Sequence, residues 1–392
     1  MKRFTLSATF MVLLSPLLWS CTPGQSTYNT SAIQTYVGSV FNSLLQTNQS
    51  AISTAQSQYT QAQLQAALRL TSEILINRDP TAAEVQSLSS GNFSTYQTLV
   101  KSYLNTPDFQ AAQLTYYRNL FGMSGMGTAG NGAAINFDEP ANLATYLVVN
   151  NHDFRESLTA TYCVNNNFQQ IPCTTFQNPA DAATQAAGAL TTQAFLQSTI
   201  GPFNFHRVNK AFQVFACRNY LLAPDTRDPG LSADEISGTV KTFNCTDSTA
   251  CNPVCYNCHK NMNSRAALFY KFDRNGFFNL APNPDPTAGE ITQTDATTPT
   301  ASTLADLLIA PAQSKYHGQV VANLRQYATV FSRNKDFRDC LAQRLSNQLL
   351  GQGPMDAMDP AMADIRDHVD LNGFNVRSIL LEIAGHPAFV NR

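Results

Sequence analysis

The residues best suited to carry chemistry in this chain are Cys255, Cys258 and His259, which form the pattern C-x-x-C-H. Two thiols three positions apart on one helical turn can reach the two vinyl groups of a haem. The histidine that follows directly is placed to bind the iron through a ring nitrogen. The pattern therefore predicts one covalently attached haem (haem c, an iron cofactor) with His259 as the proximal ligand.

Two different interpretations use the same residues without haem. Cys255 and Cys258 would form a disulfide, or they would join Cys245 and Cys251 in a four-thiol zinc site, and His259 would be incidental. Exported proteins seldom build such zinc sites, so haem is favoured.

The second axial position of the iron is the open question. Met262 lies one turn from His259 on the same side and cannot reach the opposite face of the iron. The candidates for the sixth ligand are Met355, Met358, Met362 and His206, and the histidines His317, His368 and His386 are also considered. For each single methionine, packing in the core or at the surface is the competing explanation. A methionine ligand would raise the potential, whereas an open position would permit oxidase or peroxidase chemistry, so whether the protein is an enzyme stays undecided.

Several residues near these candidates have expected roles. His317, in a loop, and His386, directly before Pro387, are expected to be exposed. Arg207, next to His206, offers a cation that could pair with a haem propionate. Asp273, shortly before Gly276, is best explained as a carboxylate that closes a turn through local hydrogen bonds. No pattern indicates a catalytic nucleophile or a catalytic carboxylate pair, so catalytic residues stay unknown.

The N-terminus indicates export. A short basic region precedes an apolar stretch at residues 4–18 that is too short to span a bilayer. Residues 18–21, Leu-Trp-Ser-Cys, resemble a bacterial lipobox, which implies removal of residues 1–20 and lipidation of Cys21. We therefore expect a lipid-anchored protein of the bacterial cell envelope, in the outer membrane and facing the periplasm or the cell surface. An ordinary cleaved signal peptide is the alternative.

The composition and the remaining cysteines fit an exported protein. Charged residues make up 13% of the chain and the formal net charge is −2, which argues against nucleic-acid binding. Six cysteines remain after Cys21, Cys255 and Cys258 are set aside, and an oxidising compartment allows them to pair. Sequence separations favour the disulfides Cys163–Cys173, Cys245–Cys251 and Cys217–Cys340, although six cysteines allow fifteen connectivities.

Hydrophobic periodicity predicts a mainly α-helical fold: a multi-helix body that carries the haem segment and a C-terminal helical subdomain. Leu64, Leu68, Thr71 and Leu75 share one helix face, and no segment alternates with period two. Thr81 with Glu84 forms a capping box, and Thr106-Pro107 opens another helix. The glycine-rich residues 122–132 are expected to be a flexible connector. Further helical patterns cover residues 140–163, 180–222, 304–308, 320–331, 337–350, 376–384 and a segment beginning at Asp359-Pro360.

These elements divide the chain into successive regions. A signal peptide (1–20) and a polar tether (21–59) precede an N-terminal helical domain (60–200). The haem-attachment segment (201–280), a surface loop (281–303) and a C-terminal helical domain (304–392) follow. A weak echo links residues 104–109 with residues 384–389, and it indicates either two related helical subdomains or chance.

Several segments around the haem motif resemble planctomycete-type cytochrome c-like secreted proteins, families of poorly defined function. The resemblance rests on Phe205-His206-Arg207 leading to Cys217, on residues 255–259, and on Phe272-Asp273-Arg274-Asn275-Gly276. It implies a helical domain, a C-x-x-C-H segment and a small C-terminal helical domain, as a bacterial lipoprotein. It extends over most of residues 60–392.

The chain departs from that family at two places. Asn263-Ser264 and Ala266 stand where an Asp-Pro pair and a glycine are usual, and Tyr270 replaces an acidic residue. Neither change touches the predicted haem ligands. The residues and the resemblance together predict electron transfer between redox partner proteins of the envelope. A structural or binding lipoprotein whose cysteines are all in disulfides is the alternative from another class.

Overall fold

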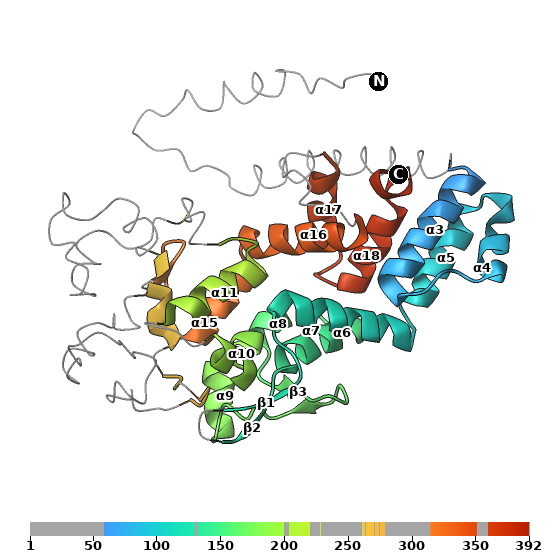
Figure 1. Cartoon of the computed structure of the whole chain (residues 1–392). Coiled ribbons are helices and arrows are strands. Elements are labelled where there is room, and N and C mark those ends of the chain that lie inside the picture. Colours follow the sequence, from blue (N-terminus) through green and yellow to red (C-terminus); the bar gives the residue numbers. More distant parts are fainter. Residues whose placement is uncertain are drawn as a thin grey trace, which may run out of the picture. The chain divides into compact units, whose positions relative to one another are not determined.

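The computed structural model describes residues 59–129, 132–199, 204–219, 228, 261–262, 264–269, 271–273, 275–278, 314–350 and 360–391. All of them belong to one compact unit that spans residues 56–392. This part of the chain is mainly helical, which confirms the predicted fold class (Figure 1). The predicted signal peptide and the surface loop at residues 281–303 lie outside the described residues, as does the polar tether except Tyr59.

The first described helices have the caps and the buried face that the sequence predicts. On α3 (Gln61–Ile76), the stripe Leu64, Leu68, Thr71 and Leu75 is fully buried. The expected capping box at Thr81 and Glu84 opens the next helix, and Thr106 caps the helix that begins at Pro107. The elements here are α4 (Ala82–Ser87), the 3-10 helix η2 (Leu88–Ser90), α5 (Phe93–Tyr103) and α6 (Pro107–Phe121).

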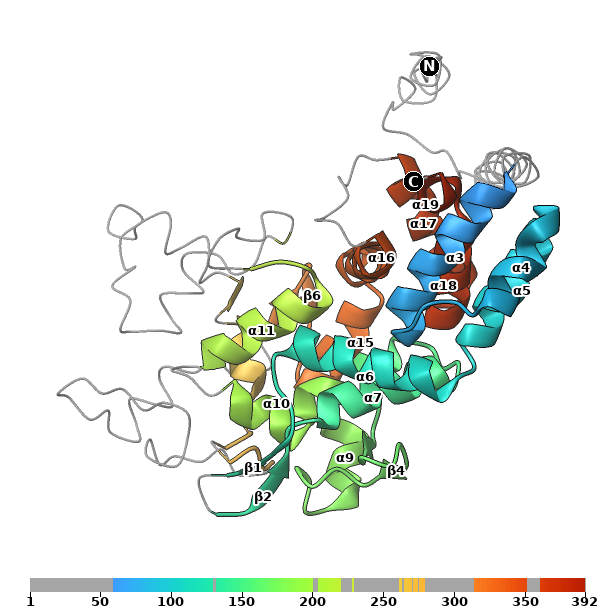
Figure 2. The same cartoon turned by 45° about the vertical axis from the view of Figure 1, so that its right-hand side comes forward.

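The sequence echo corresponds to two segments of similar local structure. Thr106 and His386 each cap a helix whose first residue is proline, and Phe109 and Phe389 are buried in the first turns. The helices before them, α5 and α18 (Val376–Gly385), are each capped by an asparagine and contact each other. α3, α5 and α18 lie side by side in both views (Figures 1 and 2). The N-terminal and C-terminal regions therefore share one hydrophobic core.

The middle of the chain is broken into shorter elements than the sequence predicts. Two glycines with positive φ, Gly122 and Gly125, redirect the chain after α6, and the expected connector contains a strand of a short hairpin. The expected helix at residues 140–163 ends at Val149, and Asn151 follows with a positive φ. Cys163 lies in a second hairpin, where it forms a disulfide with Cys173. The elements are β1 (Met126–Thr128), β2 (Ala134–Asn136), α7 (Glu139–Val149), α8 (Glu156–Thr159), β3 (Cys163–Val164), β4 (Gln170–Ile171), α9 (Pro179–Gln185), η3 (Gly188–Thr191), α10 (Gln193–Ser198) and α11 (Phe205–Phe215).

The C-terminal helices pack around α16 (Lys335–Leu350), which contacts α3, α11, α15, α17 and α18. Val320, expected to be helical, instead lies in a hairpin that turns at His317 and Gly318, both with positive φ. In the described part of the chain, no helix combines the length and the apolar character that crossing a membrane requires. The remaining elements are η5 (Ala267–Phe269), β5 (Lys315–Tyr316), β6 (Gln319–Val320), α15 (Leu324–Ser332), α17 (Pro360–Leu371) and α19 (Pro387–Val390).

Candidate functional site

The described structure includes residues that follow the predicted haem motif but not the motif itself. Cys255, Cys258 and His259 lie outside the described residues, as do Cys21, Cys245, Cys251, Met355 and Met358. The chain is described again at Asn261 and Met262, which are helical and 0% and 4% exposed. The first described residues after the predicted iron ligand are therefore buried. Met262 packs in the hydrophobic core.

Arg265 is the most deeply buried charge in this segment. Its side chain is 1% exposed and forms an ion pair and hydrogen bond with Asp228, which is equally buried. The guanidinium carbon also lies 4.5 Å from the ring centre of Phe212 on α11 and 4.8 Å from that of Tyr316 on β5. Arg265 therefore connects four separate parts of the chain through one side chain.

Arg207 anchors the end of the same segment. It is 0% exposed and donates hydrogen bonds to the backbone oxygens of Leu196 (2.8 Å), Phe272 (3.2 Å) and Asp273 (3.1 Å). These bonds join α11 to the end of α10 and to the turn that follows the haem segment. They give Arg207 a structural role that the sequence did not suggest, and pairing with a haem propionate stays a prediction.

Asp273 closes the turn, as the sequence predicts. Its Oδ1 accepts hydrogen bonds from the backbone N–H groups of Asn275 (2.8 Å) and Phe277 (2.9 Å). Gly276 has a φ of 77°, and a Cβ there would lie 3.0 Å from the backbone oxygen of Gln193. Both the positive φ and the close approach favour glycine.

The aromatic residues of the segment pack on one another. Phe272 and Phe278 form an isolated antiparallel bridge, and their ring centres are 5.4 Å apart. Phe176 lies 6.1 Å from the first ring and 5.5 Å from the second. Contacts of this kind are typical of core packing. They attach the end of the haem segment to the chain beyond the Cys163–Cys173 hairpin.

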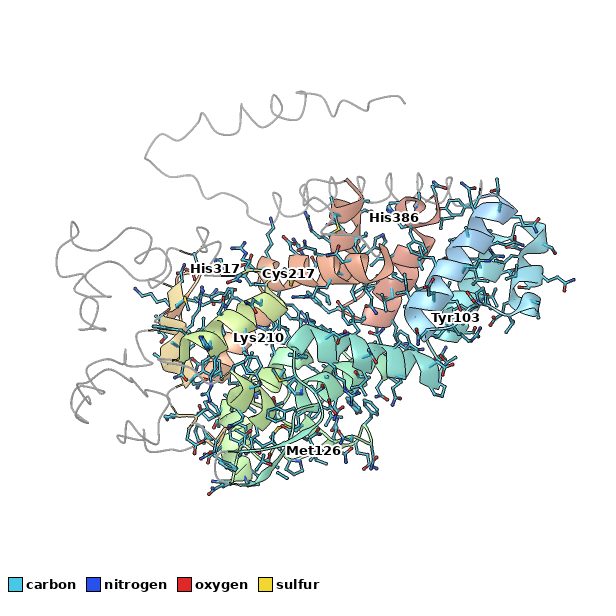
Figure 3. The ribbon with its side chains drawn as sticks, in the orientation of Figure 1. Tyr103, Met126, Lys210, Cys217, His317 and His386 are labelled. Atoms are coloured by element: carbon cyan, nitrogen blue, oxygen red, sulfur yellow. A yellow bond between two sulfur atoms is a disulfide. The ribbon has the colours of Figure 1, made fainter. Side chains whose placement is uncertain are left out.

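Both disulfides that involve described cysteines are those predicted. Cys163 bonds to Cys173, and Cys217 bonds to Cys340 across a separation of 123 residues. Cys217 lies just after α11 and Cys340 lies on α16, where these two helices meet (Figure 3). Arg344 supports the same junction, because its Nε donates to the backbone oxygen of Val214 at 3.0 Å. The chain that leads toward the motif is therefore fixed to α16.

The two described candidates for the sixth ligand lie in different environments. Met362 is 1% exposed on α17, which contacts α16 and α18. His206 is exposed at the start of α11, although its neighbour Arg207 is buried. Core packing, the competing explanation for each methionine, is thus observed for Met362. Iron ligation by Met362 or His206 stays a prediction.

Two histidines expected to be exposed are partly buried. His386 directly follows α18, caps α19 by accepting a hydrogen bond from the Ala388 N–H, and places its Nε2 3.3 Å from Asp364 Oδ2. His317 places its Nε2 3.5 Å from Asp336 Oδ2. The histidine side chains are 13% and 23% exposed, respectively. Each imidazole lies beside a carboxylate from a neighbouring helix, Asp364 or Asp336. The residues next to each histidine in the sequence did not reveal these contacts.

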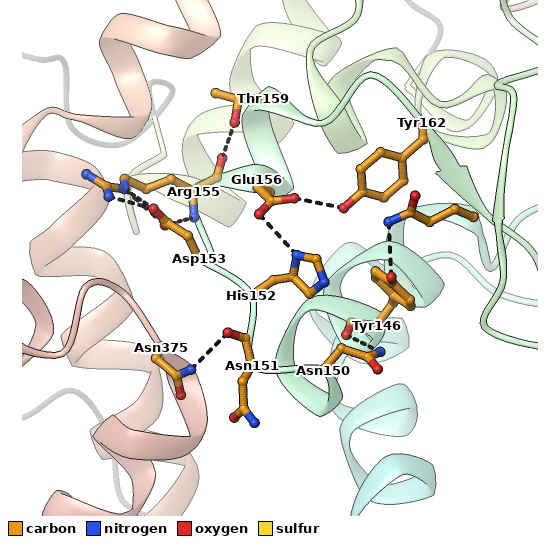
Figure 4. A network of polar contacts seen from close by, with 11 residues as sticks. Tyr146, Asn150, Asn151, His152, Asp153, Arg155, Glu156, Thr159, Tyr162 and Asn375 are labelled. Carbon is orange, nitrogen blue, oxygen red and sulfur yellow. Dashed lines mark hydrogen bonds and ion pairs between the residues drawn. The ribbon is translucent and has the colours of Figure 1, made fainter.

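A second polar cluster, which the sequence did not reveal, lies between α7 and the β3–β4 hairpin (Figure 4). Glu156 lies 3.1 Å from His152 Nδ1 through one oxygen and accepts a hydrogen bond from the Tyr162 hydroxyl at 2.8 Å through the other. Burial, together with Glu156, raises the pKa of Tyr162, so the phenol stays protonated and donates. The spacing of His152 and Glu156 by four positions was the available signal. The cluster links the start of α8 to the second hairpin.

Arg155, in the same view, is also paired with an aspartate and in contact with an aromatic ring, as Arg265 is. Arg155 donates to both carboxylate oxygens of Asp153 (Figure 4). Its guanidinium carbon lies 4.5 Å from the ring centre of Phe374. Arg155 lies between α7 and α8.

Within the described residues, no cluster of three or more His, Cys, Asp or Glu side chains is arranged to hold a metal ion. The haem prediction therefore depends on the donor set of residues 255–259, two thiols and an imidazole, which fits covalent haem by its chemistry. Comparisons with family models, curated proteins and solved structures give no match for this chain.

Proposed function

We propose that this protein is a lipid-anchored, c-type cytochrome-like protein of the bacterial cell envelope that transfers electrons between partner proteins. One observation carries the proposal: a C-x-x-C-H pattern stands two residues before a segment that is buried in the core. A haem held there would be attached next, in the sequence, to the buried residues Asn261 and Met262. When bound, the haem iron supplies one-electron chemistry.

The residues of the chain have separate tasks in this proposal. Cys255 and Cys258 hold the haem covalently, and His259 binds the iron. Arg207 fixes the turn at the end of the segment, and the Cys217–Cys340 disulfide fixes the chain before it. The sixth ligand sets whether the protein only carries electrons or also binds small ligands.

The disulfides support the envelope location. The four described cysteines are all paired, and such pairs persist in oxidising compartments. The same compartment permits the attachment of haem to exported C-x-x-C-H sequences. An acyl chain on Cys21 would hold the folded part at a membrane surface.

Covalent haem is tested by expressing the full chain in a bacterium that has the machinery for c-type haem attachment. We expect the wild type to keep a haem signal after denaturing electrophoresis, and we expect the double change Cys255→Ala with Cys258→Ala to lose it. The matched control is Cys163→Ala with Cys173→Ala, which removes a disulfide and should retain the haem. A wild-type protein without covalent haem would contradict the proposal.

The anchor is tested separately by Cys21→Ala. The wild type should be found in the membrane fraction and should incorporate labelled palmitate. The variant should lose the label and move to the soluble fraction. A wild type that is soluble and unlabelled would remove the lipid anchor from the proposal and leave the haem untouched.

A further inference from the structure

A groove of about 590 Å³ opens between α3, α6 and α16. All the residues that line it belong to the described part of the chain, and α3 contacts both of the other helices. The three helices can be followed in both views (Figures 1 and 2). The volume lies within the range of sites that bind small molecules, about 300–1,000 Å³.

The charges that line the groove are mainly negative. Glu73 on α3 and Asp108 in the first turn of α6 are exposed there, and neither carboxylate forms an ion pair with another described residue. Arg78 is the only cation in the lining, and it donates two hydrogen bonds of 3.0 Å to the carboxylate of Glu84. Arg69, four positions before Glu73, does not line the groove. Because Glu84 compensates the charge of Arg78, two carboxylates remain in excess.

The inner part of the groove offers a further acceptor and an apolar surface. The Oε1 atom of Gln348 on α16 is buried and has no hydrogen-bond partner among the described residues. A buried acceptor without a partner costs free energy, so a ligand N–H group that reached it would be stabilising. Ile74 and Ala112 add hydrocarbon surface, and the ring of Tyr116 lies in the same lining. An aromatic ring attracts a cation through its face.

We propose that this groove binds a small organic cation with two or more ammonium groups on a hydrocarbon chain, that is, a polyamine. An ammonium group has three N–H donors and no acceptor, which matches the acceptors of Glu73, Asp108 and Gln348. The methylene groups of such a ligand would pack on Ile74 and Ala112. The inference goes beyond the proposed function and does not rest on it, because none of the lining residues belongs to the predicted haem site.

Isothermal titration calorimetry of the full chain with spermidine tests the groove. We expect saturable binding at one site, and we expect butanediol, which has a hydrocarbon chain but no charge, not to bind. Because the formal net charge of the chain is only −2, general attraction of cations is weak. Added salt should weaken the binding, since the carboxylates are exposed, and magnesium chloride should act no more strongly than sodium chloride at equal ionic strength.

Charge variants of the lining should change the affinity in opposite directions. Glu73→Gln combined with Asp108→Asn should raise the dissociation constant of spermidine about tenfold. Asn119→Asp adds a carboxylate at an exposed position of the lining and should lower it. Loss of folding cannot tighten binding, so the second variant separates charge from structural damage.

Asp181→Asn is the matched control. Asp181, like Asp108, is an acid in the first turn of a helix that begins with proline. It lies on α9, away from α3 in both views (Figures 1 and 2). This variant should bind spermidine as the wild type does.

A wild type without saturable spermidine binding overturns the inference, and so does equal binding of butanediol. Unchanged affinity in both charge variants also overturns it. If the double variant does not fold, Asn119→Asp against Asp181→Asn decides the question, and equal affinities of these two contradict the inference. The presence of haem is measured separately, so none of these outcomes alters the proposed function.

Discussion

Glu139, the first residue of α7, should make the stability of this protein depend on pH near neutrality. Its side chain is 6% exposed, and its Oε2 has no hydrogen-bond partner among the described residues. Burial raises the pKa of Glu139 to about 7, although the backbone N–H groups of Ala194 and Gln193 act in the opposite direction. The carboxyl group is thus protonated in the folded protein at pH values where it is ionised in the unfolded chain.

The size of the effect follows from the two pKa values. The ordinary pKa of a glutamate is 4.5, and the folded value is about 7. A shift of one pKa unit corresponds to about 1.4 kcal/mol, so the full difference amounts to about 3 kcal/mol. Between these two pH values the folded state binds more protons than the unfolded state. Stability from this group is therefore highest below pH 4.5 and falls as the pH rises toward 7.

The change Glu139→Gln removes this proton and keeps the shape of the side chain. We expect the free energy of unfolding, measured with denaturant at pH 5 and pH 8, to fall by about 2.5 kcal/mol more for the wild type than for the variant, because pH 5 already lies above the unfolded pKa. Glu84→Gln is the control, because Arg78 lowers the pKa of Glu84 to about 2, so Glu84 is ionised throughout this window. A Glu139→Gln protein with the pH slope of the wild type would refute the reasoning.

Three further predictions concern other buried contacts. Arg207→Met should cost at least about 3 kcal/mol of stability in denaturant unfolding, since it removes the buried hydrogen bonds that the guanidinium donates to three backbone oxygens; a cost below about 1 kcal/mol would contradict this. Replacing the Cys217–Cys340 pair by serines should cost about 4–5 kcal/mol, because the disulfide closes a loop of 123 residues; an unchanged thermal midpoint would contradict this. Asp364 raises the pKa of His368, so the stability from this contact is present below pH 6.5 and is lost as the pH rises through the folded value. Asp364→Asn should therefore cost about 1 kcal/mol more at pH 5 than at pH 8, and an equal cost at both pH values would contradict it.

The features that could be predicted from the sequence are those set by local chemistry. The stripe on α3, the caps at Thr81 and Thr106 and the turn at Asp273 each depend on a few neighbouring residues. The Cys217–Cys340 link was also predicted, because the other cysteines left it as the remaining pair. Local hydrogen bonds and periodicity are strong signals of this kind.

Contacts between distant segments could not be predicted. The helix expected at residues 140–163 stops at Val149, and Cys163 belongs to a hairpin. The roles of Arg207 and Arg265 depend on carbonyl groups, carboxylates and rings that are far away in the sequence. His386 lies beside Asp364 on another helix and is partly buried, although its position before Pro387 was expected to leave it exposed. A single sequence does not contain this information, because tertiary packing decides it.

The most direct test of the account is the mass of the intact, unreduced protein purified from the envelope of a bacterium that attaches c-type haem. We predict a mass increase of one haem over the processed chain, located by digestion on the peptide that contains Cys255 and Cys258. A protein without this increase, in which Cys255 and Cys258 are joined to each other by a disulfide, would contradict the central claim.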